Sequence, residues 1–146
     1  MFGGAPIDTM SEIDICHRLR QLAGENVEAA LVADVPVSLL LSSGLDSSII
    51  LAELRRLGRQ DVETFTVGFE QKSYDESPRA ARLAKEFGFK NHVVNIDQQS
   101  LPDNLDRAIN HLDCLNANPC ILAEFAYFEA LSQSFKVTLM GSGNDE

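Results

Sequence analysis

The stretch Leu39-Leu40-Leu41-Ser42-Ser43-Gly44-Leu45-Asp46-Ser47-Ser48-Ile49-Ile50 decides how this chain folds. Its first part is apolar, as in a strand buried on both faces, and its last part begins an apolar-periodic helix. The small, hydroxyl-rich loop between them lets the backbone approach an anion, which the N–H groups and dipole of the helix start also favour. An aspartate suits such a loop when a divalent cation lies between it and phosphates. The stretch therefore predicts a metal–nucleotide site.

Strand and helix signals alternate along the rest of the chain. Upstream, Ser11 is expected to cap a helix to about Leu31, with Gly24 as a point where the helix bends or divides. Its apolar residues lie on one side: Ile13, Cys16, Leu19, Leu22, Val27 and Leu31. Strands are expected at 37–41, 64–69, 91–96 and 136–140, and helices at 47–57, 77–87, 100–111 and 121–134. Of these helices, the one at 77–87 is expected to have Ser77 as its cap and Pro78 as its first residue, and to stop at Gly88.

This alternation predicts an α/β fold, a Rossmann-like α/β/α sandwich with a parallel sheet and helices on both faces. Ligands of such sheets bind beyond the carboxyl ends of the strands. The loops at 42–48 and 141–146 are therefore expected on the same edge. Residues 1–10 are expected to be a loose leader, and the end on a glycine-acid loop suggests an incomplete domain.

The composition excludes several classes of protein. The 146 residues carry a formal net charge of −10 and show no basic stripe, so nucleic-acid binding is not expected. The odd set of cysteines, Cys16, Cys114 and Cys120, argues against a disulfide framework. No signal peptide is visible, and the longest apolar run, 35–41, is too short to span a bilayer. These features indicate a cytoplasmic protein without a membrane segment.

A loop and five further blocks of sequence resemble a known family. The loop Ser42-Ser43-Gly44-Leu45-Asp46-Ser47 lacks the ending of the common P-loop and is similar to the pyrophosphate-binding loop of the ATP pyrophosphatases. Further blocks are similar to glutamine-dependent asparagine synthetase and occur in its order: Ala33-Asp34-Val35-Pro36-Val37, Thr64-Phe65-Thr66-Val67-Gly68-Phe69, Tyr74-Asp75-Glu76-Ser77, His111-Leu112-Asp113 and the closing Gly143-Asn144-Asp145-Glu146. The resemblance covers roughly residues 25–146, and an ordered set of blocks is more specific than one motif.

The resemblance implies an adenine nucleotide α-hydrolase-like fold, with 11–146 as the N-terminal part of the ATP pyrophosphatase domain. It implies adenylation of aspartate with ATP and Mg²⁺, release of pyrophosphate, and displacement of AMP by ammonia to give asparagine. The family's glutaminase half begins with a nucleophilic cysteine, whereas Phe2 follows Met1 here and that domain is absent from the chain. The small-molecule partners would be ATP, aspartate and ammonia, and a homodimer is left open.

The resemblance also implies roles for individual residues. The pyrophosphate end of ATP would be cradled by Ser42, Ser43, Gly44, Leu45, Asp46, Ser47 and Ser48. Asp46 and Asp145 would hold magnesium and act in catalysis, and the backbone at Leu40, Val67 and Gly141 would frame the adenine and ribose. Backbone donors and hydroxyls of this kind stabilise the charge that builds on a leaving pyrophosphate.

Three residues depart from the family pattern. Ser43 stands where glycine is usual, and its Cβ would crowd a phosphate if the position needed a positive φ. Ser142 stands at the position of the family's acid, and serine cannot act as the same base. Asn144 replaces a small residue. The alternatives are a non-catalytic nucleotide-binding module and a related synthetase that amidates another carboxylate.

Other polar and aromatic residues have plainer interpretations. Asp46 alone would suit a turn or helix cap, and Tyr74-Asp75-Glu76-Ser77 a helix cap. The spacing of His111, Cys114 and Cys120 fits no tetrahedral zinc site well. The aromatic residues Phe125, Tyr127 and Phe128 are expected to form the core and surface of one helix.

Overall fold

The computed structural model describes residues 10–73, 75–97, 101–111 and 121–141. The elements follow in the order α1 (Glu12–Ala30), β1 (Val37–Leu40), α2 (Leu45–Arg56), β2 (Glu63–Phe69), α3 (Ser77–Phe87), β3 (Asn91–Ile96), α4 (Leu101–His111), α5 (Ile121–Ser132) and β4 (Val137–Leu139). All strand pairs are parallel, and the order across the sheet is β3-β2-β1-β4. The α/β fold with a parallel sheet is thus confirmed.

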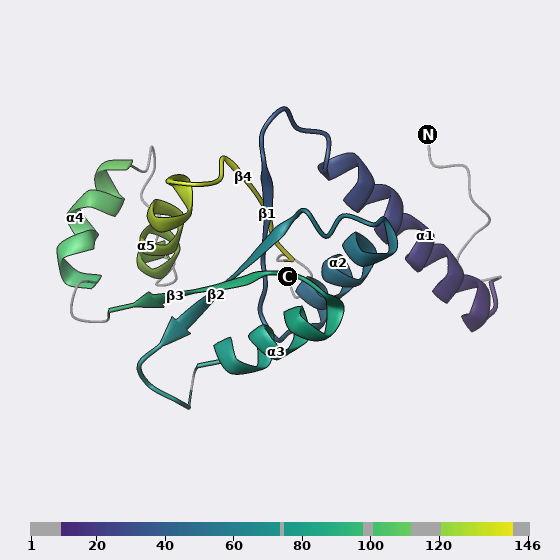
Figure 1. Ribbon diagram of the computed structural model, residues 1–146, viewed down its shortest axis with the longest axis horizontal. Helices are drawn as coiled ribbons and strands as arrows, with labels where there is room; N and C mark the ends of the chain where they lie inside the picture. Colours follow the sequence, from purple (N-terminus) through teal and green to yellow (C-terminus); the bar gives the residue numbers. More distant parts are fainter. Residues whose placement is uncertain (1–9, 74, 98–100, 112–120, 142–146) are drawn as a thin grey trace.

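Helices cover both faces of this sheet (Figure 1). On one face, Val37 and Leu39 of β1 pack in a core with residues of α1, α2 and α3. On the other face, Leu40 packs in a second core with residues of β2, β3 and α5. Successive strand side chains point to opposite faces, so one short apolar strand serves both cores.

The second core confirms the expected division of the aromatic residues in α5. Tyr127 is 4% exposed and packs in this core, whereas Phe128 is 39% exposed. Burial, together with the negative charge of Glu124, raises the pKa of Tyr127 to about 12, so its hydroxyl keeps its proton. The hydroxyl lies 4.0 Å from Met140 Sδ, at the end of β4.

Helix α1 is one continuous helix through Gly24, so the expected division there is wrong. Ser11 caps the helix as predicted, accepting a hydrogen bond from the N–H of Asp14 at 3.2 Å. Gly24 is buried where α1 crosses α2, and a Cβ at this position would lie 2.5 Å from Arg56 Nη2. Gly24 thus lies at a helix crossing, with the exposed end of the Arg56 side chain nearest to its absent Cβ.

The apolar side of α1 packs only in part. Val27 and Leu31 are buried in the first core, as a core-facing stripe requires. Nearer the start of the helix, Ile13 is 69% and Leu19 is 61% exposed. Periodicity therefore placed these residues on a helix correctly but did not show how much of the helix the core covers.

The start of α3 corrects a second expectation. Its N-cap residue is Glu76, and Ser77 is the first helical residue, with Pro78 in the same turn. Asp75 lies just before the helix, and its Oδ1 accepts a hydrogen bond from the N–H of Ser77 at 3.0 Å. The helix stops as predicted at Gly88, in the left-handed conformation with φ 82°. Residues 1–9 of the expected leader lie outside the described residues.

No helix in the described ranges combines the length and hydrophobicity that a membrane span requires.

Candidate functional site

The loop between β1 and α2 lies at the carboxyl edge of the sheet. Strand pairing continues one residue beyond β1, where the N–H of Leu41 donates to the carbonyl of Phe65 at 2.7 Å. Helix α2 begins at Leu45, two residues earlier than expected, with Gly44 as an N-cap that makes no side-chain cap hydrogen bond. The first N–H groups of a helix have no acceptor within it, so this turn offers donors at the loop.

Ser47 holds the loop in shape from within the first turn of α2. It is 3% exposed, and its Oγ lies 2.9 Å from Ser42 Oγ. The same Oγ accepts from the N–H of Ser42 at 3.2 Å. Ser48 adds a second tie, donating from its hydroxyl to the carbonyl of Gly44 at 2.6 Å. These hydroxyls fix a compact loop before any ligand arrives.

Ser43 fits this loop without backbone strain. Among the described residues, no non-glycine residue has a positive φ, so the position does not need the family's usual glycine for its conformation. The N–H and the hydroxyl of Ser43 both donate to Oε2 of Glu76, at 3.2 and 2.9 Å. Ser43 thus links the loop to the start of α3.

Gly141 brings the end of β4 against the same loop. A Cβ on Gly141 would lie 2.7 Å from the backbone nitrogen of Ser47 and 2.8 Å from the carbonyl carbon of Asp46. Such distances are far inside van der Waals contact, so only glycine fits here. The carboxyl ends of β1 and β4 therefore meet, as expected for neighbouring parallel strands.

A cavity of about 390 Å³ opens at this junction. Apolar side chains form part of its wall: Leu40, Leu41, Val67, Phe69 and Met140. Polar groups of Ser42, Ser47, Thr66 and Glu76 line the remainder, together with Gly141. A cavity with apolar walls and a few converging polar groups suits a small ligand that has a flat apolar ring and a charged end.

The structure gathers five of the residues expected to bind ATP around this cavity: Leu40, Ser42, Ser47, Val67 and Gly141. Of the remaining five, all but Asp46 lie on the loop and helix start beside it, namely Ser43, Gly44, Leu45 and Ser48, and Leu45 is 76% exposed. The acidic residues expected to hold magnesium are not among the described residues that line this cavity. Asp46 lines a neighbouring cavity of about 710 Å³ between α1 and α2, which shares Met140 and Gly141 with the first. Asp145 and Ser142 lie outside the described residues.

Sequence reasoning missed five lining residues: Leu41, Thr66, Phe69, Met140 and Glu76. The signal that could have found Glu76 is the order of strands. Because β2 lies beside β1, the segment that follows β2 ends at the same edge as the loop. The Tyr74-Asp75-Glu76-Ser77 block belongs to that segment, although Tyr74 itself lies outside the described residues.

Asp75 fixes the position of this segment. Its Oδ1 accepts from the N–H of Ser77 and, at 3.5 Å, from the N–H of Phe69 at the end of β2. Hydrogen bonds from the side chain and backbone of Ser77 lower the pKa of Asp75. The carboxylate therefore stays ionised and ties the start of α3 to the end of the strand.

The site suits a cation that is held mainly by the phosphates of a bound ligand. Within the described ranges, no group of three or more histidine, cysteine or acidic side chains could hold a metal ion. Mg²⁺ in nucleotide sites usually keeps several waters and takes only one or two protein carboxylates besides the phosphates. Asp46, in the first turn of α2, is a carboxylate suited to such a partial set.

Comparisons with known proteins give three findings. Residues 18–146 match the family model described as asparagine synthase. The chain is 33% identical over 154 residues to Amidase chyE of Penicillium rubens, covering 95% of this chain and 23% of that protein. It is 28% identical over 141 residues to glutamine-hydrolyzing asparagine synthetase 1 of Bacillus subtilis, covering 97% of this chain and 22% of that protein.

Among solved structures, the NH3-dependent NAD synthetase from Campylobacter jejuni matches with a TM-score of 0.54. The match covers 94% of this chain and 59% of that chain at 17% sequence identity, which shows a shared fold. The chain spans less than a quarter of the length of the two curated relatives.

Proposed function

Because this chain belongs to the asparagine synthase family, we propose that its carboxyl-edge cavity binds ATP with Mg²⁺ and serves the adenylation of a carboxylate. The carboxylate is that of aspartate, and ammonia then displaces AMP to give asparagine. In this proposal, residues 11–146 are the N-terminal part of the synthetase domain of a cytoplasmic protein, and residues 1–10 are a leader.

One observation carries the proposal. Five predicted nucleotide-binding residues line one cavity at the carboxyl edge of the sheet: they come from β1, the loop after it, α2, β2 and the segment that follows β4. Their roles follow from the sequence alone, and they lie up to about a hundred positions apart in the chain. Sequence similarity alone does not show that these residues line one cavity.

The two parts of the cavity suggest how ATP lies in it. The apolar wall at Leu40 and Val67, with the backbone of Gly141, suits the adenine and ribose. The loop residues Ser42, Ser43, Gly44, Leu45, Ser47 and Ser48 suit the pyrophosphate end, through hydroxyls and the free N–H groups of α2.

The chemistry assigned to the chain is electrostatic. Preorganised donors of the loop and the start of α2 stabilise the negative charge that develops on pyrophosphate as the carboxylate displaces it. Mg²⁺, when bound, neutralises part of that charge, and Asp46 and Asp145 are the residues proposed to hold it. The buried hydroxyl of Ser47 keeps the loop shaped for this task without a change at the moment of reaction.

A second candidate is the amidation of a different carboxylate. The similarity to Amidase chyE favours it, and so does Ser142, which stands where asparagine synthetases carry an acid. Both candidates use the same nucleotide cavity and differ in the acid that is activated.

Exchange of labelled pyrophosphate into ATP, in the full-length protein, tests these candidates. Exchange that depends on aspartate supports asparagine synthesis, and exchange that depends on another acid supports the second candidate. Binding of ATP without exchange for any acid would reduce the chain to a nucleotide-binding module.

Asp46→Ala should weaken binding of Mg-ATP by on the order of tenfold or more, measured by calorimetry, because a carboxylate near the cation is lost. Asp34→Ala is the matched control, since Asp34 is exposed and precedes the opposite end of β1. Equal affinity in the Asp46 and Asp34 variants would remove Asp46 from the proposed site.

A further inference from the structure

The carboxylate of Glu76 occupies donors that an anionic ligand of the loop would use. One oxygen, Oε2, accepts from both the N–H and the hydroxyl of Ser43, at 3.2 and 2.9 Å. The two residues are 33 positions apart in the chain, and Glu76 also lines the 390 Å³ cavity with Ser42 and Ser47. A negative group of the protein thus lies directly beside the proposed phosphate cradle.

This position is built into the fold. Glu76 is the N-cap residue of α3, and Asp75 before it is tied to both Phe69 and Ser77. Pro78, in the first turn, restricts the backbone of the same segment. Glu76 therefore faces the loop because the end of β2 and the start of α3 hold it there, although its own side chain is exposed.

The charge of Glu76 affects any anion that approaches the loop. A free polyphosphate meets the negative charge of this carboxylate, and it must also take the donors of Ser43 from it. A divalent cation carried by the polyphosphate changes the repulsion into attraction, because carboxylate and phosphate oxygens can share it.

We propose that Glu76 is a specificity-determining residue that makes the loop select metal-chelated polyphosphate over metal-free polyphosphate. The inference rests on the proposed function, since it requires that the cavity binds ATP. Ser43 contributes to the same selectivity, because its hydroxyl adds a second hydrogen bond to Glu76 that a glycine could not make.

Calorimetric titration of the full chain with ATP, once with excess Mg²⁺ and once with a chelator, tests the inference. The quantity to compare is the ratio of the two affinities. In Glu76→Gln, affinity for metal-free ATP should rise by on the order of tenfold while affinity for Mg-ATP stays level or falls. The ratio of Mg-ATP affinity to metal-free affinity should therefore fall by at least that factor. A purely structural role would change both affinities together and leave the ratio as it is.

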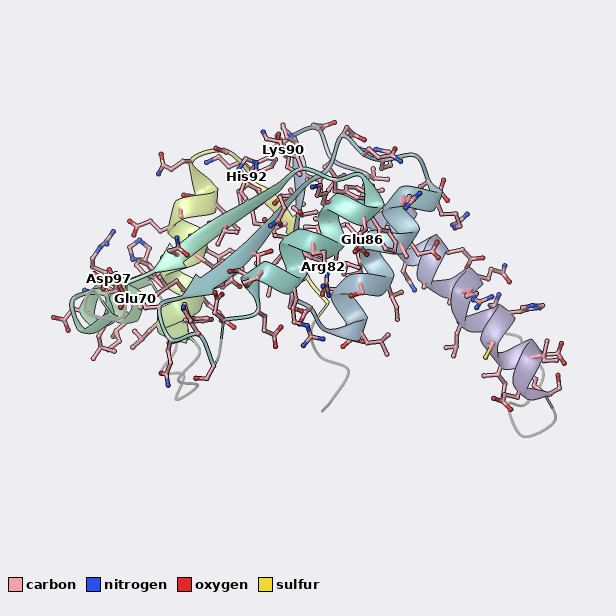
Figure 2. The ribbon with its side chains drawn as sticks, turned by 60° about the horizontal axis from the view of Figure 1, so that its bottom comes forward. Glu70, Arg82, Glu86, Lys90, His92 and Asp97 are labelled. Carbon is pink, nitrogen blue, oxygen red and sulfur yellow. The ribbon has the colours of Figure 1, made fainter. Side chains whose placement is uncertain are left out.

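Two further variants complete the test. Ser43→Ala keeps the carboxylate but removes one of its two hydrogen bonds, so the ratio should fall by less than in Glu76→Gln; this variant also serves if Glu76→Gln does not fold. Glu86→Gln is the matched control: it removes the same charge about 15 Å further along α3 and should leave the ratio unchanged (Figure 2).

The outcomes separate this inference from the proposed function. If the wild type binds ATP and the ratio is the same in all variants, the inference fails and the proposed function stands. A drop in metal-free affinity in Glu76→Gln would also overturn it, because Glu76 would then support the loop. If no variant, including the wild type, binds ATP under either condition, both fail together.

Discussion

At the amino end of the sheet, charged side chains pair with one another, whereas at the carboxyl end polar groups gather around a backbone loop. Glu63, at the start of β2, accepts from Lys90 Nζ at 2.9 Å and lies 2.6 Å from His92 Nε2. The ring of His92 also stacks on Phe65, with centroids 4.7 Å apart. Figure 2 shows Lys90 and His92 together at this end, and Glu70 and Asp97 at the other.

The difference separates polar groups that stabilise the fold from those available to a ligand. At the amino end, the charges of Glu63 and Lys90 compensate each other, and Glu63 also contacts the ring of His92. At the carboxyl end, the turn at the start of α2 has donors with no acceptor in the helix, and the donors of Ser43 face a carboxylate that a ligand could displace. Substitutions at the carboxyl end should therefore change binding, and those at the amino end only stability.

The largest expected effect comes from Gly141→Val. The new side chain would have to push the end of β4 away from Ser47 and Asp46, since even a Cβ comes within 3 Å of their backbone atoms. Overpacking of this kind costs about 1–3 kcal/mol, and an equal loss of binding free energy lowers ATP affinity by about 5- to 150-fold. Urea unfolding and calorimetry measure the two losses.

Gly88→Ala is the control for this prediction at the amino end. Gly88 has φ 82°, and no atom lies within 4 Å of where its Cβ would be. A side chain there strains the backbone by about 1 kcal/mol and lowers stability without touching the cavity. Normal ATP affinity in Gly141→Val, or reduced affinity in Gly88→Ala, would contradict the assignment of ligand binding to the carboxyl end and of stability alone to the amino end.

A smaller effect is expected when either Ser38 in β1 or Ser47 in α2 is replaced by alanine. Ser47 and Ser38 are both buried, and the Ser38 hydroxyl lies 2.8 Å from Thr138 Oγ1. Replacing either by alanine removes a part-buried hydrogen bond, which costs about 0.5–1.5 kcal/mol of unfolding free energy. Only Ser47→Ala should also weaken ATP binding, because only Ser47 shapes the loop; equal affinities would contradict that role.

The smallest effect is expected from pH at the amino end. Hydrogen bonds from Lys90 and then from His92 lower the pKa of Glu63 below its usual 4.5. A carboxyl group with a lowered pKa in the folded state stabilises the protein above its unfolded pKa, and that stability is lost as pH falls through the folded pKa.

Glu63→Gln should therefore flatten the acid side of the stability–pH curve, by about 0.2–1 kcal/mol for a partly exposed pair. Urea unfolding from pH 3 to pH 7 measures it, with ATP affinity at pH 7 as the control that should not change. A curve as steep as that of the wild type would assign the acid loss to other carboxylates.

The sequence predicted those elements whose signals are local. Strand β3 has the predicted bounds, and Ser11 and Gly88 mark helix ends as expected. The expected division at Gly24 was wrong, because this glycine lies within α1 opposite Arg56 of α2, a contact that no local pattern contains. Ser77 was taken as a cap because serine favours that position, but Asp75 places the chain so that Glu76 has it.

The residues of the candidate site also fall into those with a signal in the sequence and those that depend on contacts in the fold. The Ser42–Ser48 loop was found because its chemistry is continuous in sequence, and Leu40, Val67 and Gly141 were found through the resemblance. Glu76 was not, because its contact with Ser43 exists only once β1 and β2 lie side by side. Asp145 and Ser142 remain predictions, since they lie outside the described residues.

The strand order has a consequence for the kinetics of folding. Strand β1 pairs with β2 about 25 positions away, where Ser38 lies opposite Glu63, but with β4 a hundred positions away, where Val37 lies opposite Val137. Closing the longer loop costs more chain entropy, so we expect the β1–β4 pair to form last. Gly141 lies two residues beyond β4, and the proposed ATP site should therefore be completed only in the slowest phase of refolding.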